Sequence, residues 1–259
     1  MTTKHHISHA EQLFWGAAFH PGHFAQNGRK GMKVSLPVWV NIGAPDLGDV
    51  DSIIDAATSP ELPDTETVTY TPDTDNTSPT DGALGDSTIT IDGVLYWELD
   101  VPRNIVCQTT HGSSIVAMTV AATGLDQYYE PMSETITIAA TGTDETDAGT
   151  KAFKYLRSVA ITAVADAEAN TLNVGFGDVL GLPYRADFND QVIVFENGDP
   201  LGSGTFAAAD DTAATATTDD VRGTLDPNTA LNGTVRISVV MFPDPTSKES
   251  LFGVDQYAG

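Results

Sequence analysis

The residues with the clearest capacity for chemistry are the histidines near the start of the chain. Five of the six lie within the first 23 residues: His5, His6, His9, His20 and His23. Spacings of three and four residues suit a zinc site on one side of a helix. However, the segment has no cysteine, Glu11 is its only acid, and Pro21 and several glycines oppose a continuous helix. The pattern favours an arm that docks by stacking and hydrogen bonding, and we predict no bound metal.

Two polar segments carry residues that calcium binding or nucleophilic catalysis would need. Asp73–Asn76 offers oxygen ligands but lacks the glycine and terminal glutamate of an EF-hand loop, so a solvated acidic loop is the better interpretation. His111 stands beside Ser113 and Ser114, but neighbours in sequence do not supply the through-space geometry of a base and a nucleophile. We therefore predict a polar hairpin turn at this place.

The glycines of Gly175–Pro183 (GFGDVLGLP) suggest a phosphate-binding loop at first sight. The segment lacks the Gly-Lys-Ser/Thr ending of such a loop, and no long helical pattern follows it. We predict instead a strand that bends sharply while Val179, Leu180 and Leu182 fill the core. Acid pairs arise by chance among 36 acidic residues, and no motif sets two at a usable separation. We predict no catalytic residue, no cofactor and no enzymatic activity.

The elements that would position these residues are mostly strands. Residues 115–182 contain four alternating apolar runs, each ended by turn residues, and turns recur about every 8 to 12 residues along the chain, as in β-sandwiches and barrels. Asp92-Gly93 suits a tight hairpin between strands at 87–91 and 94–99. Further strands are predicted at 34–42 (an edge strand, because of Pro37), 68–70, 104–108, 191–196, 205–209, 221–225 and 234–242. The fold class is predicted to be all-β, a sandwich or barrel-like fold with long acidic loops.

Two local patterns interrupt the predicted strands. Asp46–Ala57 begins with an acid and places Ile53 and Ile54 together, which predicts a short helical turn. Asp100–Arg103 contains a proline and predicts a corner.

The charge balance restricts the classes of partner. The chain carries 36 acids against 12 bases, a net charge of -24, which opposes binding to nucleic acid. The apolar piece Leu13–Phe19 is too short to span a bilayer, so we expect no membrane helix and no signal peptide. Cys107 is the only cysteine, which excludes a disulfide framework within one chain and favours intracellular synthesis.

The domain organisation follows the same charge asymmetry. Residues 1–33 hold four bases and one acid, whereas the rest of the chain is strongly acidic. We predict an extended N-terminal arm at 1–33 and a β body at 34–259. The body is either one elaborated domain or a main β domain at 34–185 with a second β segment at 186–259 packed on it.

Five separate segments resemble structural proteins of tailed-bacteriophage virions. They are residues 119–143 with the turn Asp126-Gln127-Tyr128-Tyr129, 149–163 with a lysine-aromatic strand, 173–185 with the Gly-rich corner, 100–106 and 220–234. Tyr129 stands where that pattern has glycine. The resemblance implies a part of the virion, specifically a head decoration or cement protein, and it implies no catalytic residues.

The resemblance also sets the expected partners. A decoration protein binds the major capsid protein of the assembled shell, and itself as a homo-oligomer, of which a trimer is one form. Its expected location is the capsid surface of the virion, and the host cytoplasm during assembly. We predict that the arm supplies the anchors to the shell or to a neighbouring copy: Phe14, Trp15, Phe19, Phe24, Arg29, Lys30 and Lys33.

Two other classes of function stay open from the sequence. A tail-tube, neck or tail-fibre component would share the β architecture. A carbohydrate- or calcium-binding β module would use Trp39, Tyr96 and Trp97 as a stacking platform.

Overall fold

The computed structural model describes residues 37–57, 67–72, 87–110, 117–139, 144–163, 170–201, 204–210 and 220–242. In these residues the regular elements are strands, apart from one 3-10 turn, η3 (Asn189–Gln191). The predicted all-β class is confirmed. The predicted arm at 1–33 and much of the predicted acidic loops lie outside the described residues.

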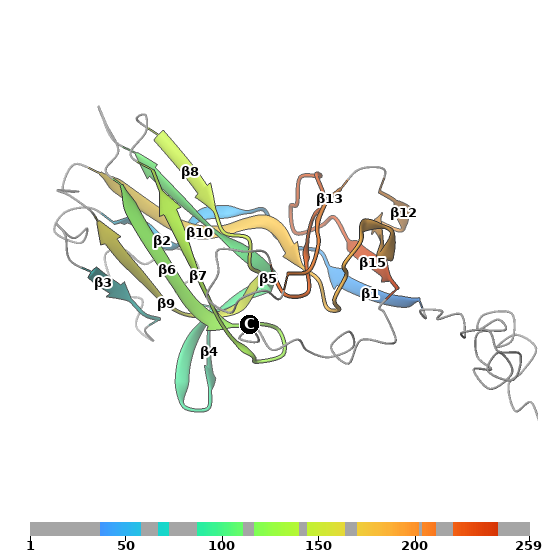
Figure 1. Ribbon diagram of the computed structural model, residues 1–259, viewed down its shortest axis with the longest axis horizontal. Helices are drawn as coiled ribbons and strands as arrows, with labels where there is room; N and C mark the ends of the chain where they lie inside the picture. The colour runs from blue at the N-terminus through green and yellow to red at the C-terminus, as the bar shows by residue number, and fades with distance from the viewer. Residues whose placement is uncertain are drawn as a thin grey trace, which may run out of the picture.

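Eleven antiparallel strands form the larger sheet. Its main path follows the order β13 (Thr205–Ala207), β14 (Thr224–Asp226), β10 (Thr171–Gly181), β5 (Val94–Thr110), β9 (Phe153–Ala163), β6 (Met118–Leu125) and β7 (Pro131–Ile138). Beside this path, β2 (Asp49–Ala57) pairs with β10, β3 (Thr67–Tyr70) with β9, and both β4 (Thr88–Ile91) and β8 (Asp144–Ala148) with β5. The sheet curls into a half-barrel (Figure 1).

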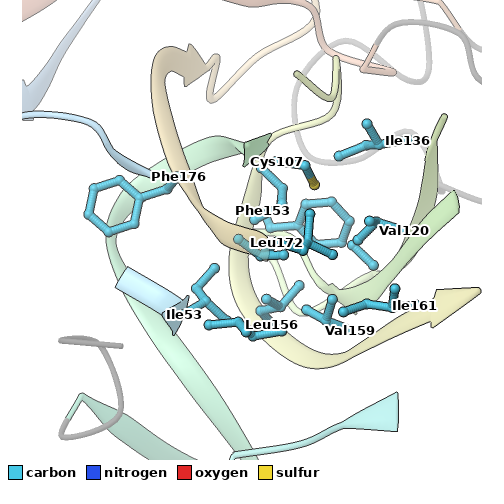
Figure 2. Close-up of a cluster of buried hydrophobic side chains, with 14 of the residues drawn as sticks. Ile53, Cys107, Val120, Ile136, Phe153, Leu156, Val159, Ile161, Leu172 and Phe176 are labelled. Atoms are coloured by element: carbon cyan, nitrogen blue, oxygen red, sulfur yellow. The ribbon is translucent and has the colours of Figure 1, made fainter. Parts of the chain in front are cut away.

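The main core fills the concave side of this half-barrel. Alternation along the strands puts every second side chain inside, as in β6, where Met118, Val120 and Ala122 are buried. Figure 2 shows side chains from β2, β5, β6, β7, β9 and β10 converging on one another, among them Ile53, Phe153 and Leu172. The burial of these apolar side chains is the main stabilising contribution to the half-barrel.

The smaller sheet has the order β1 (Val38–Gly43), β15 (Ile237–Met241), β11 (Val192–Glu196) and β12 (Asp199–Pro200). It lies at the opposite end of the molecule from β3 (Figure 1). One face covers a second apolar cluster that includes Leu182, Val239 and Met241. Because β1 joins strands from the C-terminal part of the chain, the two sheets do not divide at one point in the sequence. The division of the body after residue 185 stays a prediction.

Most of the predicted strands are present, and the hairpin is the clearest case. Asp92 and Gly93 have φ angles of 50° and 81°, the left-handed values that a tight hairpin turn requires. Asn197 and Gly198, with φ angles of 51° and 95°, make the corresponding turn between β11 and β12. The predicted edge position of the first strand is confirmed, since β1 is the terminal strand of its sheet.

Two local predictions are wrong. The segment predicted as a helical turn forms β2, because pairing with β10 buries Ile53 and Ile54 in the sheet core. The corner predicted at Asp100–Arg103 is part of the continuous strand β5. Its proline is accommodated where the pairing of β5 with β9 shifts register, between Glu98 and Arg103.

Candidate functional site

The predicted anchor residues cannot be placed in this structure. Phe14, Trp15, Phe19, Phe24, Arg29, Lys30 and Lys33 all precede residue 37, as do the five N-terminal histidines, so they lie outside the described residues. The same holds for the Asp73–Asn76 loop and for His111 with its neighbouring serines. These predictions therefore stay predictions.

The glycines of residues 175–183 serve close packing of backbone. A Cβ atom on Gly175 would lie 1.8 Å from the carbonyl oxygen of Asp49 in β2, and one on Gly177 would lie 2.6 Å from Oδ1 of Asn104. The predicted bend is present as a register shift in β10 between Phe176 and Leu180. Leu180 and Leu182 are buried, as predicted, whereas Val179 is only partly buried. These glycines let β2 and β5 approach β10, which is a structural role.

Residues 126–130, 182–183 and 220–223 meet in one buried polar junction. The carboxylate of Asp126 accepts hydrogen bonds from the backbone N–H groups of Tyr128 (2.6 Å) and Glu130 (3.0 Å) and forms an ion pair with the guanidinium of Arg222. That guanidinium lies 4.8 Å from the centre of the Tyr128 ring. The Tyr128 hydroxyl donates to the carbonyl oxygen of Pro183 at 2.6 Å. The turn after β6 is thereby fixed to the corner after β10.

Further hydrogen bonds tie the same segments together. Gln127 donates through Nε2 to the Leu182 carbonyl oxygen at 3.1 Å, and the Leu182 N–H donates to Gly223 at 3.2 Å. Asp220 accepts from the backbone N–H groups of Arg222 (2.9 Å) and Ala152 (3.2 Å). The junction thus links the half-barrel to the segment that leads into the smaller sheet.

Besides Asp126, the buried acids around this junction are Glu134 and Asp220, and burial shifts the pKa of both. Desolvation raises the pKa of Glu134 and of Asp220, although backbone N–H groups donate to both carboxylates. Burial lowers the pKa of the Lys151 ammonium, while the charges of Glu134 and Asp220 oppose that shift. The Glu134 carboxylate accepts a hydrogen bond from the Thr150 N–H at 2.5 Å, which joins β7 to the connection between β8 and β9. These contacts hold the backbone of residues 150–152 and 222 against the two carboxylates.

An exposed apolar surface on the smaller sheet is the better candidate for function. Trp39, Val240 and Ile193 are direct cross-strand partners on β1, β15 and β11, so they form one row on the outer face. Phe195 lies two residues further along β11, and its ring centre is 4.9 Å from that of Trp39. Trp39 is 59% exposed and Ile193 is 44% exposed. We call these four residues the Trp39 face.

The Trp39 face is the main concentration of exposed apolar side chains in the described residues. Of the five large hydrophobic residues that are exposed there, Trp39 and Ile193 belong to this face, and Phe188 directly precedes the turn into β11. Asp190, Glu196 and Asp199 border the strands, with Arg236 as the nearby base. An apolar centre with a polar rim is the usual anatomy of a protein interface.

Sequence patterns identified only part of this face. The alternation of Val38, Val40 and Ile42 with Trp39 and Asn41 indicates that Trp39 points away from the core. Ile193, Phe195 and Val240 were missed, because their position beside Trp39 depends on the pairing of strands about 150 to 200 residues apart in the chain.

The predicted aromatic platform is not formed. Trp97 is 1% exposed within the main core, Tyr96 belongs to a separate cluster with Leu125 and Tyr155, and Trp39 lies on the other sheet. The three rings therefore do not share a surface on which a sugar could stack.

Other chemistry finds no support within the described ranges. They contain no group of three or more His, Cys, Asp or Glu side chains placed to hold a metal ion. Cys107 is fully buried, and burial raises the pKa of its thiol, so it is poorly suited to act as a nucleophile. No helix in these ranges has the length and hydropathy needed to cross a membrane.

Comparison of the chain with protein-family models, with curated proteins and with solved structures finds no match.

Proposed function

We propose that the protein is a structural component of a tailed-bacteriophage virion, and specifically a head decoration protein. In this role it binds the assembled shell of the major capsid protein and stabilises it. The observation that carries the proposal is the Trp39 face, a rigid apolar surface on a sheet whose strands pair in regular antiparallel register. The sequence resemblance around the buried junction points in the same direction.

The charges around the Trp39 face define the partner surface it would fit. Asp190 and Asp199 are exposed and Glu196 is partly exposed, against the single exposed base Arg236, so acids outnumber bases among these residues around the apolar centre. A complementary surface carries an apolar patch with lysine or arginine at its rim. We propose that the capsid protein presents such a patch on the outside of the shell.

Stabilising a shell requires more than one contact for each decoration unit. When one rigid oligomer binds several shell subunits, each contact raises the effective concentration of the next. The predicted anchors of the arm at 1–33 would supply further contacts in addition to the Trp39 face. Removal of residues 1–33 would test the arm's share separately.

The proposal is tested by binding to shells assembled without the decoration protein. Trp39→Ala should reduce the amount of protein that cosediments with shells, because large aromatic residues near the centre of an interface commonly cost 2 kcal/mol or more, about thirtyfold in affinity, when truncated. Leu47→Ala is the matched control, since Leu47 is also 59% exposed but lies in the loop between β1 and β2. Equal binding of the two variants would contradict the role of the Trp39 face. Failure of the unaltered protein to bind shells would overturn the decoration role itself.

A tail-tube, neck or tail-fibre component remains the alternative within the same class. Electron microscopy of virions with the protein gold-labelled distinguishes the two, because a decoration protein is distributed over the head. A carbohydrate-binding module has no comparable support, because Trp39, Tyr96 and Trp97 lie in three separate places and form no common stacking surface.

A further inference from the structure

Lys151 is a buried amine beside the polar junction. Only 1% of this residue is exposed, although lysine in folded proteins is almost never fully buried unless it is paired. Lys151 lies in the connection between β8 and β9, and its backbone N–H donates to the two carboxylate oxygens of Glu134 at 3.3 and 3.4 Å. A buried ammonium group must either be paired with opposite charge or lose its proton, and both outcomes depend on the acids around it.

Two buried carboxylates lie within reach of this amine. Glu134 accepts from the N–H of Lys151 itself, and Asp220, which is 2% exposed, accepts from the N–H of the next residue, Ala152, at 3.2 Å. Standard covalent lengths therefore place an oxygen of each carboxylate within about 6 Å of the Lys151 Cα atom. The flexible four-carbon stem of lysine can span that distance. The charges of both acids also act on the Lys151 ammonium, so the three groups share one space that is shielded from water.

Burial shifts all three groups towards their uncharged forms. Desolvation lowers the pKa of the Lys151 ammonium and raises the pKa of Glu134 and of Asp220. Transfer of a proton from the ammonium to a carboxylate gives a neutral amine beside a neutral carboxylic acid. A desolvated neutral lysine is a nucleophile, and a protonated carboxyl group is attacked more readily than a carboxylate. The environment therefore favours a reactive pair of groups.

The hydrogen bonds of the two acids suit them to different parts in such a reaction. In Asp220, Oδ1 accepts from the Arg222 N–H at 2.9 Å and Oδ2 from the Ala152 N–H at 3.2 Å. Fixed donors on both oxygens stabilise the negative charge that develops there when a nucleophile adds to the carboxyl carbon. In Glu134, the N–H and the hydroxyl of Thr150 both donate to Oε1, which offsets part of the effect of burial and suits Glu134 to exchange a proton.

We propose that Lys151 and Asp220 become joined by a covalent amide bond inside the folded chain, with Glu134 transferring the proton. Nζ of Lys151 attacks Cγ of Asp220, so that an Nζ–Cγ bond forms and the C–OH bond of the carboxyl group breaks. Glu134 takes a proton from the nitrogen and passes it to the departing hydroxyl, which leaves as water. One ammonium and one carboxylate thus become one amide and one water molecule, and neither an oxidant nor a reductant is required.

Position and exclusion of water make this condensation feasible. Groups held in a reactive orientation behave as if they were present at about 10⁵ to 10⁸ M, a concentration that free amines and carboxylic acids never reach. A closed site also excludes the water that would reverse the reaction. Ala152 and Asp220 are 68 residues apart in the chain, so the bond would close a long loop and restrict the unfolded chain, as a disulfide does. The inference concerns the junction alone and does not depend on shell binding.

The test is the intact mass of the full-length protein, measured by mass spectrometry under denaturing conditions. The unaltered protein should be lighter than its sequence requires by one water molecule, and proteolysis should yield one branched peptide that contains both Lys151 and Asp220. Lys151→Met and Asp220→Ala should each have the full mass. Glu134→Gln should gain the bond more slowly than the unaltered protein, because it cannot accept the proton. The mass of the unaltered protein decides the matter even where a variant does not fold.

Lys154→Met is the matched control, because it removes an amine that is instead paired with Glu98 at 3.1 Å. This variant should still lack one water molecule. An unaltered protein of full mass would overturn the proposal and show that Lys151 remains a charged partner of the acids. A loss of water that persists in Lys151→Met would also overturn it, since cyclisation at a site such as Asp92-Gly93 would then be the source. A protein of full mass that binds shells would leave the decoration role intact.

Discussion

The carboxylate of Asp126 and the guanidinium of Arg222 are 96 residues apart in the chain and form an ion pair with side chains only 2% and 3% exposed. The carboxylate also accepts two backbone N–H groups, and the guanidinium packs over the Tyr128 ring. Because these partners compensate much of the cost of burying the charges, the pair can fix the turn after β6 against the segment before β14. It is therefore a structural link between the half-barrel and the rest of the chain.

Breaking this ion pair should strongly destabilise the fold. Asp126→Asn keeps an oxygen for the backbone N–H groups but leaves the Arg222 charge buried without its counter-charge. Arg222→Met leaves the Asp126 carboxylate buried without its counter-charge. Each should lower the free energy of unfolding by about 3 to 5 kcal/mol, measured by urea denaturation.

The double variant Asp126→Asn/Arg222→Met is the control for the pairing itself. Since it removes both charges together, its loss of stability should be well below the sum of the two single losses. Additive losses would show that each side chain acts through other contacts.

Tyr129 combines a strained backbone with a useful side chain. Its φ angle is 67°, in the left-handed region that favours glycine. Tyr129→Gly should relieve the strain and lose the stacking on Tyr155, whereas Tyr129→Ala should lose the stacking and keep the strain. The glycine variant should therefore be more stable than the alanine variant by roughly 1 to 2 kcal/mol in thermal or urea unfolding. An alanine variant as stable as the glycine variant would contradict the assigned backbone strain.

Gly175 should be among the least replaceable residues of β10. A Cβ atom there would meet the backbone of Asp49 and Val50, at 1.8 Å from a carbonyl oxygen, so β2 would have to move. Gly175→Ala should cost about 1 to 3 kcal/mol or more, as overpacked cores do. Gly204→Ala is the control, because its nearest atoms lie 3.2 and 3.3 Å away and require only a small adjustment. Hydrogen exchange should show β2 as the strand that loses protection in Gly175→Ala.

Sequence patterns correctly predicted those elements whose structure depends mainly on neighbouring residues in the chain. The Asp92-Gly93 turn and the alternation of β6 and β7 each fix a short element whatever the rest of the chain does. The prediction failed at β2, where acids followed by Ile53 and Ile54 resemble the first turn of a helix. What decides that segment is its pairing with β10, which is about 120 residues away in the chain.

The site depends on long-range geometry even more than the fold does. Nothing near Asp126 in sequence indicates Arg222, and nothing near Trp39 indicates Ile193. In both cases the register of the strands and the path of the connecting segments decide which residues become neighbours. A short sequence motif contains no information about either. The sequence could predict that Trp39 is exposed, but it could not predict that an apolar surface forms around it.

The acids at the start of β2 should make stability depend on pH in a defined direction. A hydrogen bond with Asp49, then partial burial and the charges of Asp49 and Asp55, raise the pKa of Asp51 from 3.8 to about 6. Between these values the folded protein holds a proton at Asp51 that the unfolded chain releases. The contribution of Asp51 to stability therefore increases as pH falls from above 6 towards 4, and its charge is unfavourable at neutral pH.

Asp51→Asn removes that unfavourable charge, so it should stabilise the protein at pH 7.5 and lose most of this advantage at pH 4.5. Thermal unfolding of both proteins at the two pH values measures the difference. Lowering the pH also reduces the general repulsion in so acidic a chain, which makes a charge control necessary. Asp92→Asn removes the same charge from the exposed hairpin turn and reports that general effect alone. An advantage of Asp51→Asn that is the same at both pH values, or no larger than that of Asp92→Asn, would mean that Asp51 releases its proton as readily in the folded protein as in the unfolded chain.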